Sequence, residues 1–177
     1  MAAQVVSANL TFNFQATQTD SAGLINPITA SGGIQYPSSL GTFANATGAA
    51  NSVDTMYAAS LTLSAAATHI NLHAATDILG NSVVFARVRG WCVYVTTLTA
   101  AYLVNVYTRT GTDPLVWLPV TTSGALWCAP GGIMCATDPT STSTNGYVVS
   151  STSYDFTLDP GSNTVACYVL IIGNSAA

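Results

Sequence analysis

Charged residues are scarce in this chain of 177 residues, which contains no lysine and no glutamate. Only 6% of its residues are charged, whereas soluble domains usually carry about 25%. Mixed surface charge normally keeps a free monomer solvated and limits its self-association. The deficit therefore favours a protein whose surface is buried against copies or partners, or one that works outside the cell at low concentration. A Ser/Thr-rich extracellular lectin shares this composition and stays an alternative.

Basic residues are limited to three arginines, against seven aspartates, and the net charge is -4. Nucleic-acid binding depends on Lys and Arg side chains that neutralise phosphates, so we expect no nucleic-acid partner. A Gly-rich phosphate loop is excluded, because its lysine is missing. The first residues lack the early Lys or Arg of a secretory signal, and we expect synthesis in the cytoplasm. Threonines and an asparagine interrupt the uncharged stretch 90–107, which favours two strands over a membrane span, and we expect no membrane partner.

The four cysteines lie in apolar runs that resemble strands and lack the CxxC spacing of zinc sites. We expect Cys92, Cys128, Cys135 and Cys167 to be buried free thiols. An alternative is a disulfide between Cys128 and Cys135, which flank a Pro-Gly-Gly turn. Such a bond would form only after release from a reducing compartment. The sequence leaves open whether any of the cysteines pair.

Residues with catalytic or metal-binding potential are few and poorly placed. His69 and His73 lie on one face of an alternating THINLH segment, so a strand would hold their rings roughly 13 Å apart, too far to share a metal ion. The GxSxG motif of a serine nucleophile is absent. Asp155 and Asp159 make a poor glycosidase pair, because Asp159 opens an Asp-Pro-Gly turn. We therefore expect a protein that is not an enzyme, with no catalytic residues, no metal and no cofactor.

Strand signals recur at short intervals after Tyr57 and are separated by turns rich in Gly, Pro and Asn. This pattern predicts an all-β fold, an antiparallel β-sandwich with jelly-roll-like topology. The uncharged run 165–172 predicts a strand in the middle of a sheet, covered on both faces. No segment has a sustained helical period, although residues 75–79 could form one helical turn. The three tryptophans are predicted to pack in the core, and stacking on sugars is the alternative. The predicted strands span residues 59–64, 68–73, 83–88, 91–97, 102–109, 116–120, 125–128, 132–136, 147–150, 154–158 and 164–172.

The N-terminal part of the chain has a different composition. Residues 4–14 alternate and predict a first strand. Residues 15–52 are rich in Gly, Ala, Ser and Thr and predict either a functional loop or an extended arm that becomes ordered on a partner, and we take the arm as our prediction. We therefore divide the chain into an N-terminal strand and arm, 1–56, and a β-sandwich body, 57–177. The large apolar residues of the arm are predicted partner contacts: Leu24, Ile25, Ile34, Tyr36, Leu40 and Phe43.

Arg87 and Arg89 are two of the three positive charges and are further candidates for a partner contact. On a strand they share one face with Phe85. They could bind an aspartate of a neighbouring subunit through two parallel hydrogen bonds, and a salt bridge within the chain is the open alternative.

Several stretches carry a resemblance to a known class of protein: SLTLSAAATHINL, TDILGNSVVFARVRGWCVYV, APGGIMCATDP and LDPGSNTVACYVLIIGNSAA. Together they cover residues 59–177 and resemble small structural proteins of tailed-phage virions, similar to capsid cement or decoration proteins. The resemblance implies a homo-oligomer on the capsid surface of the virion, which binds the major capsid protein and stabilises the assembled head. The Gly/Ala/Ser-rich region before Val53 departs from this pattern. A tail or fibre module that binds a host glycan and a shell-forming jelly-roll capsid protein stay as alternatives.

Overall fold

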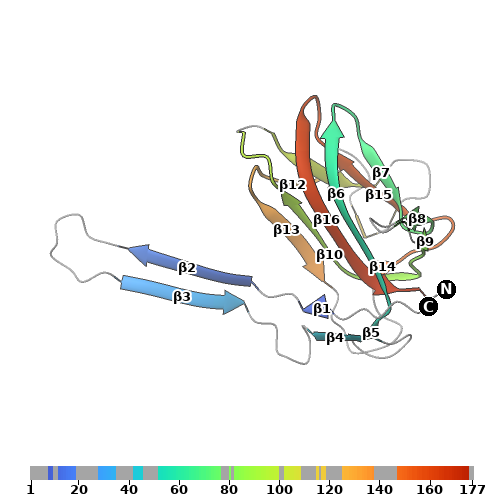
Figure 1. The fold of residues 1–177 in the computed structure, drawn as a ribbon, viewed down its shortest axis with the longest axis horizontal. Helices are drawn as coiled ribbons and strands as arrows, with labels where there is room; N and C mark the ends of the chain where they lie inside the picture. The colour runs from blue at the N-terminus through green and yellow to red at the C-terminus, as the bar shows by residue number, and fades with distance from the viewer. Residues whose placement is uncertain are drawn as a thin grey trace.

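The described part of the chain consists of strands, turns and irregular segments, without a helix, in the computed structural model (Figure 1). It also contains no helix of the length and apolarity that a membrane crossing requires. The prediction of an all-β chain is confirmed for this part. The structure describes residues 8–9, 12–18, 28–34, 42–45, 52–76, 80, 82–99, 102–108, 115, 117–118, 125–137 and 147–175.

The first sheet contains the longest strands of the body. Its strand order is β13 (Ile133–Thr137), β10 (Arg87–Val95), β16 (Thr164–Asn174) and β6 (Thr55–Ser64), and β14 (Tyr147–Val148) pairs with one end of β10. All of these pairs are antiparallel. As predicted, the apolar C-terminal strand β16 lies in the middle of the sheet, between β10 and β6.

The second sheet lies behind the first in Figure 1. Its strand order is β12 (Leu126–Cys128), β11 (Val104–Tyr107), β15 (Asp155–Asp159) and β7 (Thr68–Asn71), again with antiparallel pairs. A short antiparallel pair, β8 (Ala75–Thr76) and β9 (Ser82–Val83), lies beside it.

The hydrophobic core fills the space between the two sheets. Alternate residues of each strand point inward, because successive side chains of a strand face opposite sides. Trp91 of the first sheet meets Phe156 of the second edge to face, with ring centroids 5.6 Å apart. Buried residues of the core include Leu63, Trp91, Val93, Val95, Val104, Val106, Phe156, Leu158, Val165, Val169 and Ile171.

A β-bulge interrupts the pairing of β10 with β16. Val88 pairs with Gly173 and Gly90 pairs with Ile172, so Arg89 is the extra residue. The predicted gap at residues 89–90 between two strands is therefore wrong, because β10 continues through both positions. Gly173 allows the close approach of the two strands: a Cβ atom there would lie 2.0 Å from the carbonyl oxygen of Arg87.

Two further sequence predictions are corrected. Trp117 and Leu118 lie in a turn, and the amide of Leu118 donates to the carbonyl of Leu115 at 3.0 Å, so the predicted strand 116–120 is wrong at these two positions. Ala75 and Thr76 form strand β8, so the predicted helical turn is wrong at its start, and the rest of it lies outside the described residues.

The N-terminal strands form two small sheets. β1 (Ala8–Asn9), β4 (Thr42–Asn45) and β5 (Ser52–Val53) gather at the lower end of the first sheet, and the β4–β5 pair is parallel (Figure 1). β2 (Phe12–Gln18) and β3 (Ile28–Ile34) pair as an antiparallel hairpin that extends away from the sandwich (Figure 1). The predicted arm, 15–52, thus contains strands, which its Gly-, Ala-, Ser- and Thr-rich composition did not predict.

Candidate functional site

The outer face of the first sheet is apolar and open to solvent. Its register aligns side chains in rows across four strands, because directly paired residues share a face. The first row is Ile133, Tyr94, Tyr168 and Ser60. The second row is Cys135, Cys92, Leu170 and Ala58. We call these eight residues the outer face, and none of them is charged.

An aromatic pair occupies the middle of the outer face. The rings of Tyr94 and Tyr168 stack with centroids 6.3 Å apart and an interplanar angle of 18°. Tyr94 is 39% exposed and Tyr168 is 53% exposed, while Ile133 beside them is 57% exposed. Soluble monomers rarely leave contiguous apolar patches open unless those patches have a role in binding.

A shallow hollow of about 300 Å³ lies beside this pair. It forms where the small side chains of β6 meet the large ones of β16 and β10. Its described lining residues are Ala58, Ala59, Ser60, Cys92, Tyr94, Tyr168, Val169 and Leu170. Because these residues are uncharged and mostly apolar, the hollow suits an apolar side chain and offers little to an ionic ligand.

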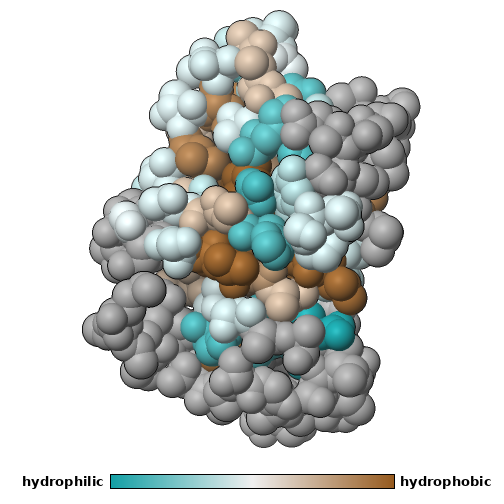
Figure 2. Space-filling view, turned by 90° about the vertical axis from the view of Figure 1, so that its right-hand side faces the viewer, coloured by the Kyte–Doolittle hydropathy of each residue, from teal (hydrophilic) through white to brown (hydrophobic). Residues whose placement is uncertain are grey.

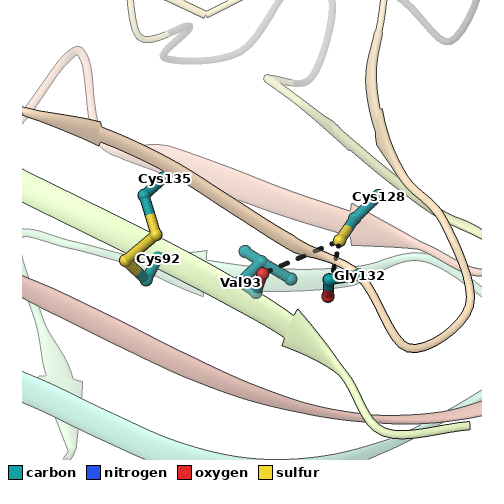
Figure 3. Close-up of a disulfide and its surroundings, with 5 residues drawn as sticks. All are labelled: Cys92, Val93, Cys128, Gly132 and Cys135. Atoms are coloured by element: carbon teal, nitrogen blue, oxygen red, sulfur yellow. Dashed lines mark hydrogen bonds between the residues drawn. A yellow bond between two sulfur atoms is a disulfide. The ribbon is translucent and has the colours of Figure 1, made fainter. Parts of the chain in front are cut away.

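A disulfide joins Cys92 of β10 to Cys135 of β13 on the outer face (Figure 3). The prediction of four free thiols is therefore wrong, and Cys128 is not the partner of Cys135. The sequence separation of 43 residues hid the pair, because nothing local in the sequence shows that these two strands are neighbours. The short spacing of Cys128 and Cys135 around a turn suggested that pair instead.

Cys128 and Cys167 are free and buried in the core. The Sγ atom of Cys128 lies 3.2 Å from the carbonyl oxygen of Gly132 and 3.7 Å from that of Val93, and its thiol donates there (Figure 3). Burial raises the pKa of Cys128. Burial, followed by the nearby Cys128, raises the pKa of Cys167 to about 11. Both thiols are therefore protonated and unreactive near neutral pH.

Below the outer face, the same side of the first sheet is covered by the chain itself. Ile172 points outward from β16 in the next row, beside Met56 of β6. Val53 of β5 packs on these two residues and is fully buried, and Ile172 is 6% exposed. The side chains of Asp54 and Ser175 reinforce this contact, since Ser175 Oγ donates to Asp54 Oδ2 at 2.6 Å.

The two predicted contact arginines have different surroundings. Arg89, at the bulge, is 1% exposed, and its Nε donates to Asn174 Oδ1 at 3.2 Å. It therefore lies inside the isolated chain and not on its surface. Arg87 is half-buried, and its buried Nε has no hydrogen-bond partner among the described residues. A contact between Arg87 and a neighbouring subunit stays a prediction.

The other predicted contact residues are only partly placed by the structure. Ile34 ends β3 and Phe43 lies in β4. Leu24, Ile25, Tyr36 and Leu40 lie outside the described residues. Partner contact at all six positions stays a prediction.

A histidine and an aspartate meet on the outer side of the second sheet. Nδ1 of His69 lies 3.2 Å from Asp155 Oδ1 and 2.8 Å from the hydroxyl of Thr157. That hydroxyl donates to Asp155 Oδ2 at 2.5 Å, so His69 Nδ1 acts as a donor. The group satisfies a carboxylate that is 1% exposed, which is a structural role, and it lies on a different sheet from the hollow.

The surface elsewhere agrees with the low charge content. Figure 2 shows the side that faces right in Figure 1, where strongly hydrophilic residues form a narrow band and much of the other described surface has intermediate hydropathy. Trp127 is 66% exposed on the second sheet, so its predicted place in the core is wrong. Among the described residues, no group of three or more His, Cys, Asp or Glu is placed to hold a metal ion.

Comparisons with protein-family models, with curated proteins and with solved structures found no match to this chain.

Proposed function

We propose that this chain is a structural protein of a virion, a non-enzymatic capsid cement or decoration protein that binds the assembled phage head. Its partners on the capsid surface are the major capsid protein and copies of itself. The observation that carries the proposal is the outer face of the first sheet, where exposed tyrosine, leucine and isoleucine side chains surround an uncharged hollow. Such a surface suits burial against another protein.

The order of the strands supports the same proposal. Among the described residues after Ser52, the strands of three or more residues are, in chain order, β6, β7, β10, β11, β12, β13, β15 and β16. The first pairs with the eighth, the second with the seventh, the third with the sixth and the fourth with the fifth. This is the pairing of a long double ribbon rolled into two sheets, from which we infer a jelly-roll topology. Viral capsid proteins and lectins use that architecture.

The mechanism of such a protein is adhesion. A protein that binds the assembled head, and not its separated subunits, stabilises the assembly by mass action. At a free concentration of 100 times its dissociation constant, it adds about 2.7 kcal/mol per site. No charged substrate group has to be recognised, which agrees with the scarcity of charge in the chain.

The test is cosedimentation of the purified chain with heads isolated from the phage that encodes it. We expect saturable binding at a fixed stoichiometry, and a higher temperature for disruption of the decorated heads. Absence of binding at micromolar concentrations contradicts the proposal. Assembly of the pure chain into closed shells would instead identify a major capsid protein.

A second function is favoured by one observation. Tyr94 and Tyr168 form an exposed stacked pair, and aromatic rings are common platforms for sugar rings. A tail or fibre module that binds a host glycan is therefore the alternative. A glycan array distinguishes the two, because only the alternative predicts a signal that is lost in Tyr168→Ser.

A further inference from the structure

We propose that the outer face of the first sheet is covered by the β2–β3 hairpin of a second copy of this chain. The inference rests on the proposed function and deepens it, since it names the contact through which copies associate. Two surfaces carry it, one on the hairpin and one on the sandwich, and each is apolar and uncharged.

The hairpin is amphipathic by its register. Phe12 pairs with Ile34, Phe14 with Gly32 and Ala16 with Ala30, and paired residues lie on the same face. One face therefore consists of apolar residues and glycine. The residues between them, such as Asn13, Gln15 and Thr17 on β2, lie on the other face and are polar. The apolar face comprises Phe12, Phe14, Ala16, Ala30, Gly32 and Ile34.

The β2–β3 hairpin extends away from the described sheets of its own chain (Figure 1). An isolated two-stranded hairpin is marginally stable at best in water. A surface that covers its apolar face would therefore stabilise the hairpin itself.

The outer face fits the hairpin in size and chemistry. A strand of seven residues is about 23 Å long, and the four paired strands of the first sheet span about 14 Å. At about 200 Å² for a whole aromatic side chain, the exposed fractions of Tyr94 and Tyr168 leave about 180 Å² in these two residues alone. Neither face carries a charge that would have to be desolvated on contact.

Continuity with an existing contact supports the same occupant. At the lower end of the first sheet, Val53 of the chain's own β5 already covers Ile172 and Met56. The open rows of the outer face begin directly above this covered row. The N-terminal part of each chain thus covers one row of this side of the sheet, and a hairpin from a second copy would cover the remaining rows.

Sedimentation velocity of the full chain and of two matched pairs of variants tests the proposal. Tyr168→Asp spoils the outer face, and Trp127→Asp places the same charge on the exposed surface of the second sheet. Phe14→Asp spoils the apolar face of the hairpin, and Gln15→Asp places the same charge on its polar face. We expect the unmodified chain to form a dimer or a larger oligomer.

Tyr168→Asp and Phe14→Asp should each raise the dissociation constant at least about tenfold, because the new carboxylate would be desolvated without a partner. The two control variants should stay within about twofold of the unmodified chain. Circular dichroism of each variant checks that the sandwich remains folded.

Mixing the two disrupted variants gives the decisive result. The intact hairpin of Tyr168→Asp can bind the intact face of Phe14→Asp, so the mixture should form a one-to-one complex that neither variant forms alone. A monomeric unmodified chain, or a mixture that stays monomeric, overturns the proposal. The proposal is also overturned if Tyr168→Asp disrupts the oligomer and Phe14→Asp does not. In that case the outer face is still an interface between copies, and the proposed function is not contradicted. Failure to bind heads contradicts the proposed function separately.

Discussion

Reduction of the Cys92–Cys135 disulfide should destabilise the sandwich without unfolding it under native conditions. The bond joins directly paired residues of β10 and β13, so it ties the third strand of the body to the sixth. Both cysteines are half-buried on the outer face, where a reductant can reach them. The alternative perturbation is the double variant with Cys92→Ala and Cys135→Ala.

The expected magnitude follows from the length of the closed loop. A disulfide stabilises a fold largely by limiting the freedom of the unfolded chain, and a separation of 43 residues corresponds to about 4 kcal/mol in that model. Measured values are typically about 2–4 kcal/mol, which is the loss we expect in the free energy of unfolding. With a urea dependence of about 2 kcal/mol per molar, the unfolding midpoint should fall by about 1–2 M.

Urea unfolding followed by tryptophan fluorescence measures this loss, since Trp91 is 3% exposed and reports on the core. The unmodified chain is compared with and without reductant, and the double variant serves as control because reductant should not change its midpoint. A thiol titration of the denatured protein counts the free cysteines in each sample. The reasoning is refuted if reductant frees all four thiols while the unfolding midpoint stays the same.

Two further predictions concern backbone packing and ionisation. Gly173→Ala should lower the free energy of unfolding by about 3 kcal/mol or more, because its Cβ would lie 2.0 Å from the carbonyl oxygen of Arg87. Gly161→Ala, at a turn with open space around it, should lower the free energy of unfolding by only about 1–2 kcal/mol. Urea unfolding of the two variants measures the difference. The buried Cys167 should contribute to loss of stability at alkaline pH, since its pKa is about 11 when folded against 9.0 in the reference state. The stabilisation associated with the protonated Cys167 thiol is fully present below pH 9. It is lost as the pH rises toward 11, because the thiol releases its proton at a lower pH in the unfolded chain than in the folded one. Unfolding curves from pH 8 to 11 should be less dependent on pH in Cys167→Ala, and equal dependence would contradict this.

Much of the sandwich was predictable because its strands follow local rules. The turns after residue 57 contain Gly, Pro and Asn at positions that need special backbone angles, and β16 is the longest apolar run. These signals are local in the sequence, so they predict the positions of the strands and do not predict which strands pair. The bulge at Arg89 was missed for the same reason, since it exists only in the pairing of β10 with β16.

The outer face was missed because composition alone does not distinguish a buried residue from an exposed one. The apolar run 165–172 predicts a strand covered on both faces, yet Tyr168 is 53% exposed and Leu170 is 36% exposed. A signal was present in the alternation of β16, whose inward residues are Val165, Cys167, Val169 and Ile171. In a two-layer sandwich each strand has only one face toward the core, so the other residues of an apolar strand must be covered by something else or remain exposed.

The same reasoning connects the scarcity of charge with the exposed tyrosines. A chain with three arginines and a net charge of -4 has little electrostatic repulsion with which to oppose association through an apolar surface. Cys92 and Cys135 lie within that surface, and their thiols would remain reduced in a cytosol. The disulfide between β13 and β10 therefore forms only under oxidising conditions.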